Sequence, residues 1–419
     1  MSAVAASSVG FTKIDLFCRG LRLGDPELAQ LAEDGGTGIR RTRAGLGSGL
    51  ELVLPGGVRV NVPVVEPFTR HSPYTLRRLE RGRYALVRDG TEVVPVTLTS
   101  RPAWYGLTTR GGRTMDRIGT LQGTYLAIYQ SRVCDFWRDR ERQQNCGFCS
   151  VGLNLGVDDA LEKTTDEILE VVHAARAESR ITYVDFNTGH LDGERYLDLL
   201  EPALARIKRE TGILVGVQCP PHSDLTRYDR LRAMGVNRVS FCLEVFDAAS
   251  FRELCPGKSE TYGRERYLEA IRYCAQLGAR GPRTEPWVTN GEIIAGLEPV
   301  ESTIRCIDWL TGVGAIPTVC VFRPLVGTRL AGREPPRTED VIPIYRRLFE
   351  ACMERGLPIG AAPNIRVSIV PLPEECADLS ERRFPLKRAK IRALRGLLGW
   401  KLGRAGLHKS PVEMNTHRQ

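Results

Sequence analysis

Three cysteines stand in one short polar stretch of the sequence, "VCDFWRDRERQQNCGFCSVG" at residues 133–152. A zinc site normally takes four protein ligands, and Cys134, Cys146 and Cys149 have no fourth Cys or His close by in the sequence. Three thiolates fit a [4Fe-4S] cluster with one iron left open, because soft sulfur ligands suit iron–sulfur chemistry. The alternative is three unrelated buried thiols, which a stretch rich in Arg and Gln disfavours.

The composition is that of a globular protein that keeps its thiols reduced. The 419 residues are 42% hydrophobic and 26% charged, and the twelve cysteines are spaced irregularly, unlike a disulfide framework. There is no apolar run of about 18 residues, and the amino terminus lacks the order of a secretory signal. These features predict a cytoplasmic protein without a transmembrane segment.

Six β-prone runs alternate with helical patterns after residue 119, and they must position the cysteine stretch. Apolar spacing predicts helices over 166–177, 264–278 and 300–314 between them. Such units imply parallel strands with right-handed crossovers, and hence an α/β fold with a full or partial barrel whose chemistry lies at the carboxyl ends of the strands. The expected strands are 124–130, 181–186, 213–218, 238–245, 287–296 and 316–324.

The amino-terminal region reads differently, as a small β-rich domain. Residues 45–118 contain short alternating stretches, and Asp89-Gly90 between two of them is a hairpin signal. Within this region, "RHSPYTLRRLERG" (70–82) predicts a short helix, because Ser and Pro precede apolar and basic residues at helical spacing.

The cysteine stretch resembles the cluster motif of the radical S-adenosylmethionine (SAM) superfamily, through Cys-Gly-Phe-Cys at 146–149 with an aromatic residue before the last cysteine. The spacing here is C-x11-C-x2-C, whereas C-x3-C-x2-C is usual in that superfamily. Over residues 10–335 the chain is similar to the radical SAM proteins of bacterial nitrilase gene clusters, and more distantly to lipoyl and biotin synthases. The segments that carry this similarity are "HSPYTLRR", "CGFCSVGLNLG", "VQCPP", "CLEVFD", "CPGKSETYGRERYLEAI", "IIAGLEP" and "FRPLVGT".

The resemblance implies a [4Fe-4S] cluster on the three cysteines, SAM as cofactor, and a 5′-deoxyadenosyl radical that abstracts hydrogen from a small organic substrate. It also implies an electron donor such as flavodoxin or ferredoxin, and it hints at nitrile-related or specialised metabolism. The residues that it places near SAM are Phe148, Thr188, Gly189, Gln218, Glu244, Arg266, Phe322 and Arg323.

Each of these residues also has a purely structural explanation. Thr188 and Gly189 could form a plain strand-to-helix turn, and Phe148 and Phe322 could be core residues. Glu244 lies in an apolar strand and needs a partner, for which an ion pair with Arg266 competes with a role at SAM.

Three further residues have competing interpretations. Arg264 is the fallback for Arg266 as a ligand of the SAM carboxylate, since a guanidinium binds carboxylates well. His190 is expected to be a surface loop residue rather than a catalytic one. Cys219, at the end of a predicted strand, is expected to be an ordinary buried thiol.

The carboxyl-terminal region is strongly basic. Ten Lys or Arg and no acidic residue lie between Arg382 and Lys409, which accounts for the formal charge of +9. Apolar residues at helical spacing predict a helix that docks on the barrel and leaves a solvated basic face, in preference to contact with nucleic acid, an acidic partner or a membrane; these are Ile391, Leu394, Leu398 and Leu402.

Together these features predict a radical SAM enzyme in three parts. They are a β-rich domain (1–118), a partial (β/α)6 barrel resembling the TIM barrel (119–335), and a helical extension with a basic tail (336–419). Two alternatives stay open at this point. One is a sulfur-inserting enzyme like lipoyl or biotin synthase, with Cys18, Cys255 and Cys376 meeting as an auxiliary cluster site. The other is a non-enzymatic metalloprotein or RNA-binding module, although nucleic-acid binding is not expected.

Overall fold

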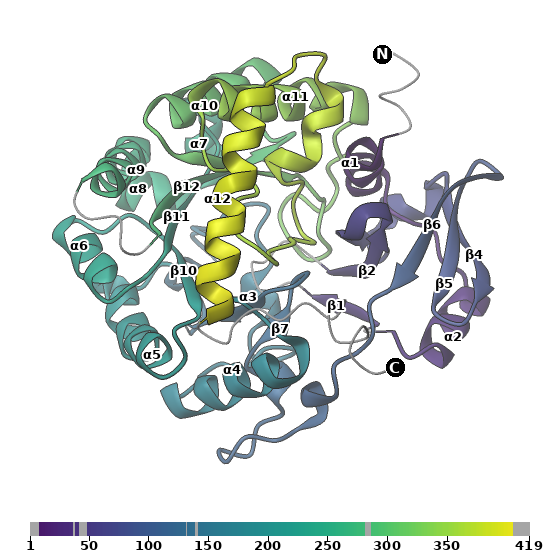
Figure 1. The fold of residues 1–419 in the computed structure, drawn as a ribbon, viewed down its shortest axis with the longest axis horizontal. Coiled ribbons are helices and arrows are strands. Elements are labelled where there is room, and N and C mark those ends of the chain that lie inside the picture. Colours follow the sequence, from purple (N-terminus) through teal and green to yellow (C-terminus); the bar gives the residue numbers. More distant parts are fainter. Residues whose placement is uncertain are drawn as a thin grey trace.

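The computed structural model describes residues 8–36, 38–41, 48–130, 132–138, 141–280 and 286–404. Two β-sheets dominate it, an antiparallel sheet near the amino terminus and a mostly parallel sheet in the middle of the chain (Figure 1). The predicted basic tail beyond residue 404 lies outside the described residues.

The antiparallel sheet has six strands in the order β1-β2-β6-β5-β4, with β3 paired to β2. Asp89 (φ +48°) and Gly90 (φ +80°) form the predicted two-residue hairpin turn between β5 and β6, because positive φ at both positions matches the strand twist. The strands are β1 (Ile39–Arg41), β2 (Ser48–Leu54), β3 (Val58–Pro63), β4 (Tyr74–Glu80), β5 (Arg83–Arg88) and β6 (Thr91–Leu98).

The helix predicted within residues 70–82 is wrong, because Tyr74–Glu80 form β4, an antiparallel partner of β5. Tyr74 and Leu76 are both buried at alternate positions, so a period of two governs this segment. Pairing with β5 overrides the local helical spacing.

A buried helix that the sequence did not predict, α1 (Val9–Arg19), lies between the antiparallel sheet and the rest of the protein. Lys13 of α1 is fully buried and bonds to Glu375 at 2.8 Å, while Asp15 accepts a hydrogen bond from Tyr74 at 2.6 Å. These polar contacts and a continuous cluster of buried apolar side chains join the two sheets.

The second sheet holds six parallel strands in the order of the chain, plus a short antiparallel strand β7 (Thr120–Leu121) at its β8 edge. It curls into a partial barrel: β13 and β7 are its two edges, and among the described residues no pairing joins them. All six predicted strands are confirmed to within three residues. They are β8 (Leu126–Tyr129), β9 (Tyr183–Asn187), β10 (Leu214–Cys219), β11 (Arg238–Glu244), β12 (Val288–Ala295) and β13 (Ile316–Val321).

Helices line the outer face of this sheet, as crossovers between parallel strands require (Figure 1). The three predicted helices are confirmed as α4 (Thr165–Ser179), α9 (Gly263–Ala279) and α10 (Val300–Gly312). The other α-helices are α2 (Asp25–Glu33), α3 (Val151–Asn154), α5 (Tyr196–Thr211), α6 (Thr226–Ala233), α7 (Ala248–Leu254), α8 (Pro256–Thr261), α11 (Thr338–Arg355) and α12 (Pro385–Arg404).

Candidate functional site

The cysteine loop follows β8 directly and lies at the carboxyl end of the parallel strands. Cys134 precedes a short 3-10 turn at Asp135–Trp137, and Cys149 stands two residues before α3. The Gly147 N–H donates to the Leu254 carbonyl at 2.8 Å, and the Leu330 N–H donates to the Gly147 carbonyl at 3.1 Å. The loop is therefore held between the end of α7 and the segment after β13.

The three thiols differ in acidity. Burial raises the pKa of Cys134 to about 12 and raises that of Cys149 as well. The pKa of Cys146 is lowered, chiefly by a hydrogen bond from the buried thiol of Cys255. A buried thiol with a raised pKa releases its proton when its sulfur binds a metal, so this donor set suits thiolate ligation.

The spacing of the three thiols is also informative. In the part of the chain that the structure describes, no three His, Cys, Asp or Glu side chains stand at the distances that a single metal ion needs. The three thiols are nonetheless near enough for the charge of Cys146 to act on both Cys134 and Cys149. Soft sulfur donors of this kind suit an iron–sulfur cluster.

Gly189 brings the end of β9 against the cysteine loop. A Cβ atom on Gly189 would lie 2.5 Å from Cys134 Cβ and 2.7 Å from the Tyr129 hydroxyl, so no other residue fits without a shift. The neighbouring Thr188 N–H donates to the Gln218 carbonyl at 3.1 Å. The two residues expected to approach SAM through their backbone thus lie beside a cysteine of the trio.

Gln218 continues this rim at the end of β10. Its side-chain oxygen accepts a hydrogen bond from the Asn187 amide at 2.6 Å, which links the ends of β9 and β10. Both side chains point into the curl of the sheet, because they stand in register on neighbouring parallel strands.

Glu244 ends β11 in a strained backbone conformation. Its φ is +70°, and the Val245 N–H donates to the Leu243 carbonyl at 2.9 Å, which makes Glu244 the centre of a γ-turn. This turn type is rare and strained for a residue with a side chain. The pairing of β11 with β12 also shifts register between Cys242 and Glu244. Strain at the carboxyl end of a barrel strand points to a functional position.

The partner of Glu244 is Lys258 in α8, so the alternative of an ion pair with Arg266 is wrong. Lys258 Nζ lies 3.2 Å from Glu244 Oε1 and donates to the Cys242 carbonyl at 2.7 Å. The Lys258 side chain is 12% exposed and lies over the Tyr267 ring at 5.7 Å. In the sequence, Lys258 stands 14 positions after Glu244, and this nearby cation is what could have indicated the ion pair.

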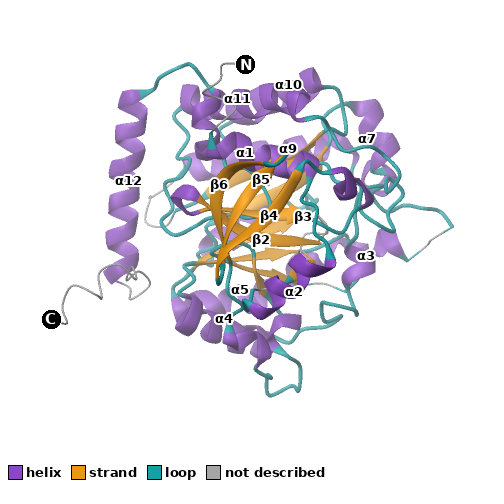
Figure 2. Cartoon of the chain, turned by 90° about the vertical axis from the view of Figure 1, so that its right-hand side faces the viewer, coloured by secondary structure: helices purple, strands orange, loops and turns teal. Residues whose placement is uncertain are grey.

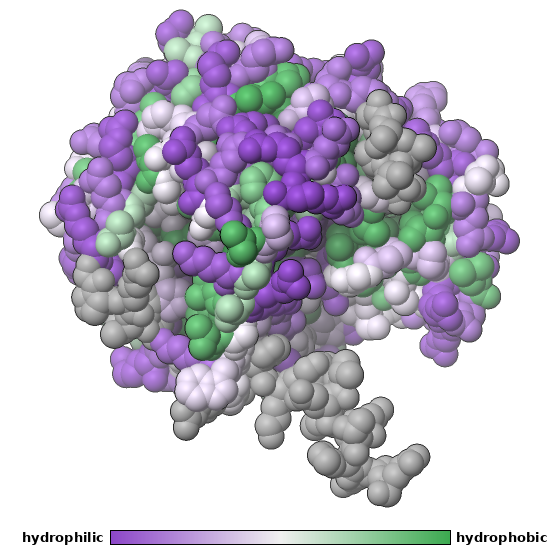
Figure 3. All heavy atoms as spheres, turned by 45° about the horizontal axis from the view of Figure 1, so that its top comes forward, coloured by the Kyte–Doolittle hydropathy of each residue, from purple (hydrophilic) through white to green (hydrophobic). Residues whose placement is uncertain are grey.

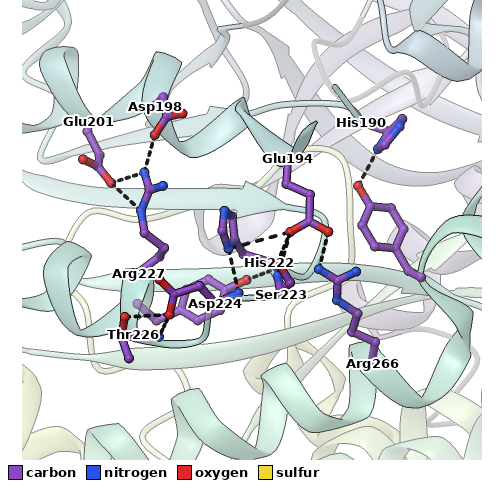
Figure 4. A network of polar contacts seen from close by, with 12 residues as sticks. His190, Glu194, Asp198, Glu201, His222, Ser223, Asp224, Thr226, Arg227 and Arg266 are labelled. Carbon is purple, nitrogen blue, oxygen red and sulfur yellow. Dashed lines mark hydrogen bonds and ion pairs between the residues drawn. The ribbon is translucent and has the colours of Figure 1, made fainter. Parts of the chain in front are cut away.

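Arg266 instead forms an ion pair with Glu194, which follows the end of β9 (Figure 4). The Glu194 carboxylate also accepts hydrogen bonds from the backbone and side chain of Ser223, at 2.7 and 2.8 Å. Arg264, the fallback, donates to the Phe246 carbonyl at 2.8 Å and contacts Glu265. The structure therefore places Arg266 near the rim but commits its guanidinium to a protein carboxylate.

The remaining predicted residues are buried. Phe148 is 6% exposed and Phe322 only 1%. Arg323 turns its side chain toward the antiparallel sheet, where it donates to the Asn61 carbonyl at 2.6 Å and lies 5.0 Å above the Phe17 ring. Only the backbone of Arg323 stays at the end of β13.

Several positions on one face of the parallel sheet carry buried polar side chains. Arg238, at the start of β11, donates to Asp185 at 3.1 Å and to Glu292 at 3.0 Å, and Ser240 donates to Glu292 at 2.8 Å. Burial raises the pKa of Glu292. The interior of a TIM barrel is usually filled by branched apolar residues, so this polar lining is unusual for a core and typical of a binding chamber.

Two other expectations are settled by burial. His190 is 7% exposed, stacks on Phe136 at 4.2 Å and contacts the Tyr262 hydroxyl at 2.5 Å, so it is not a surface residue. Cys219 is fully buried, as expected of an ordinary core thiol.

The three cysteines considered for an auxiliary cluster are not grouped. Cys255 adjoins Cys146, whereas Cys18 in α1 and Cys376 belong to the core around Tyr345. Cys255 is therefore a neighbour of the trio, which its position in the sequence did not indicate.

Comparison with known proteins agrees with this geometry. A sequence model of the Radical SAM superfamily matches residues 143–310, which include Cys146 and Cys149 but not Cys134. Bacteriochlorophyllide c C-7(1)-hydroxylase of Chlorobaculum limnaeum is 26% identical over 262 residues, which cover 57% of this chain. The chain spans 63% of the length of that relative.

Solved structures with a similar chain trace include methylornithine synthase (PylB), with 19% identity, a TM-score of 0.42, and coverage of 68% of this chain and 82% of that one. Coproporphyrinogen III oxidase (HemN) from Escherichia coli has 17% identity and a TM-score of 0.36, with coverage of 55% and 52%.

Proposed function

We propose that the chain is a radical SAM enzyme whose [4Fe-4S] cluster is held by Cys134, Cys146 and Cys149 at the carboxyl ends of β8 to β11. The observation that carries this proposal is the contact between the cysteine loop and Gly189, since it joins the thiols to the strand ends that would bind SAM. Cluster and SAM together supply one-electron cleavage to methionine and a 5′-deoxyadenosyl radical, which abstracts hydrogen from the substrate.

The residues of this chain would position the cofactor. Thr188 and Gly189 offer backbone groups, because the missing Cβ leaves room for close approach. Glu244, fixed by Lys258, presents a carboxylate that suits a ribose hydroxyl or an ammonium group. Gln218 stands beside them on β10.

The other predicted residues have more limited parts in this arrangement. Phe148, Phe322 and the backbone of Arg323 would cover the adenine. Arg266 would reach the SAM carboxylate only by leaving Glu194, so its part is the weakest of the set.

The substrate is proposed to be small and polar. Asp185, Asn187, Ser240, Asn290 and Glu292 face the inside of the curled sheet, and hydrogen bonds join them to Arg238 or to neighbouring strands. Polar side chains on this face of the sheet favour a substrate with charged or hydrogen-bonding groups. The hydroxylase relative supports functionalisation of a C–H bond as the reaction class.

The nitrile-related role rests on the sequence resemblance alone. A flavodoxin or ferredoxin remains the proposed electron donor. The alternative of a sulfur-inserting enzyme is less favoured, because Cys255 lies at the trio rather than with Cys18 and Cys376. The non-enzymatic alternative is set aside, since the chain is an enzyme.

The test is anaerobic reconstitution with iron and sulfide, followed by reduction and assay of 5′-deoxyadenosine from SAM. Wild type is expected to form it, and Cys134→Ala, Cys146→Ala and Cys149→Ala are each expected to lose the cluster and the product. Cys219→Ala is the matched control, since Cys219 is a fully buried thiol outside the loop. Cluster assembly that survives loss of any one of the three cysteines would overturn the ligand assignment.

A further inference from the structure

Helix α12 lies on the outside of the protein and contacts the rest along one side only. In Figure 1 it crosses the front of the molecule, and in Figure 2 it stands at the edge, beside the body. Phe384, just before the helix, packs against Phe349 at 5.9 Å, and Lys387 Nζ donates to the Glu354 carbonyl at 2.7 Å. Near the other end Leu402 is 7% exposed. Ile391 and Leu402 therefore dock as predicted, whereas Leu394, also predicted on the docking side, is 37% exposed.

The outward side carries a second apolar stripe that the docking does not use. Leu386, Ala389, Ala393, Leu397 and Trp400 follow each other at i, i+3, i+7, i+11 and i+14, which is one face of a helix. Leu386 is 85% exposed, Leu397 65% and Trp400 63%. Three large apolar side chains are thus presented to solvent on one helix.

Basic residues border this stripe. At about 100° per residue, Lys390 and Lys401 lie on one side of it, and Arg392 lies on the other. Residues 385–404 contain seven Lys or Arg and no Asp or Glu. Figure 3 shows this mixture, with hydrophobic residues set among strongly hydrophilic ones over the region that α12 crosses in Figure 1.

We propose that α12 lies flat on an anionic phospholipid surface, with this stripe in the interface and its basic borders against lipid phosphates. An exposed apolar face flanked by Lys and Arg, with a Trp near its end, is what an interfacial helix requires. None of the described helices is both long and apolar enough to cross a bilayer, so the contact is one of surface binding. This inference is independent of the radical chemistry.

Two other occupants of this face are less compatible with it. A second copy of α12 would bring two basic helices together without an acidic residue between them, which is repulsive. A polynucleotide would use the cations but would leave Leu386 and Leu397 without a role, because backbone binding depends on charge. An anionic lipid surface is the occupant that contacts both the apolar stripe and the basic residues beside it.

The test is sedimentation of the full-length protein with vesicles of phosphatidylcholine alone, or of phosphatidylcholine mixed with phosphatidylglycerol. Binding is expected with the anionic vesicles only, and it should weaken as salt rises. The double variant Leu386→Gln/Leu397→Gln is expected to lose at least about tenfold in vesicle affinity, since two large apolar contacts are removed.

The matched control is Leu28→Gln/Leu79→Gln, two exposed leucines of α2 and β4 on the antiparallel-sheet side of Figure 1. It should bind as wild type does, and both double variants should keep the wild-type melting temperature and 5′-deoxyadenosine formation without vesicles. Equal binding to neutral vesicles, equal loss in both double variants, or binding to a single-stranded polynucleotide but not to vesicles would each overturn the proposal.

Discussion

Lys258 Nζ contacts both the Glu244 carboxylate, at 3.2 Å, and the Cys242 carbonyl, at 2.7 Å. Glu244 is the centre of the γ-turn that ends β11, and Cys242 directly precedes that turn. One largely enclosed cation thereby holds a strained backbone and its side chain together, next to the thiols of Cys146 and Cys255. A site that must present a carboxylate at a fixed place gains from this arrangement, because the geometry is set before any ligand arrives.

Replacing this cation tests its positioning role. Lys258→Met leaves the Glu244 carboxylate, which is 14% exposed, without its partner, and the loss of one member of a largely enclosed pair lowers stability. We expect stability to fall and SAM affinity to fall at least about tenfold, while the iron content after reconstitution is kept. Anaerobic calorimetry with SAM and iron analysis measure the two effects. Lys13→Met, which breaks another ion pair, should lose stability only.

The strain at Glu244 can be measured by comparing two substitutions. Glu244→Gly and Glu244→Ala both remove the carboxylate, but only glycine accepts φ of +70° without strain. The glycine variant should therefore be more stable than the alanine variant by about 1 kcal/mol in urea unfolding. Equal stabilities, or a more stable alanine variant, would show that the turn is not strained.

The sequence predicted the parallel sheet well, because apolar runs bounded by glycine and polar residues mark buried strands wherever they pack. It also placed Cys134 just after the first strand of this sheet, at the carboxyl ends of the strands. It missed α1 and misread residues 74–80, because both are shaped by contacts far away in the chain. The sequence did not predict the ion pair of Lys258 with Glu244 for the same reason. The pair depends on the γ-turn at Glu244, and local sequence patterns do not encode that turn.

Cys255 is expected to tune the cluster without binding it. Its thiol donates a hydrogen bond to Cys146, and hydrogen bonds to the sulfur of a ligand raise the reduction potential of a cluster. Cys255→Ala should keep the iron content and lower the potential, measured by redox titration followed by electron paramagnetic resonance. Cys274→Ala, at another fully buried thiol, should leave the potential unchanged. Loss of the cluster in Cys255→Ala would instead mark Cys255 as a ligand.

The buried imidazole of His190 predicts a pH dependence of stability. Burial lowers the pKa of His190 in the folded protein below its usual value near 6.5, so the unfolded chain binds a proton more readily. The stability that this neutral histidine contributes is therefore present above about pH 6.5 and is lost as the pH falls toward the folded value. His190→Phe keeps the stacking on Phe136 and removes the titration. The free energy of unfolding of the cluster-free protein should fall less steeply in the variant than in wild type between about pH 6.5 and 5. Parallel slopes for the two proteins would mean that His190 is already solvated and charged in the folded state.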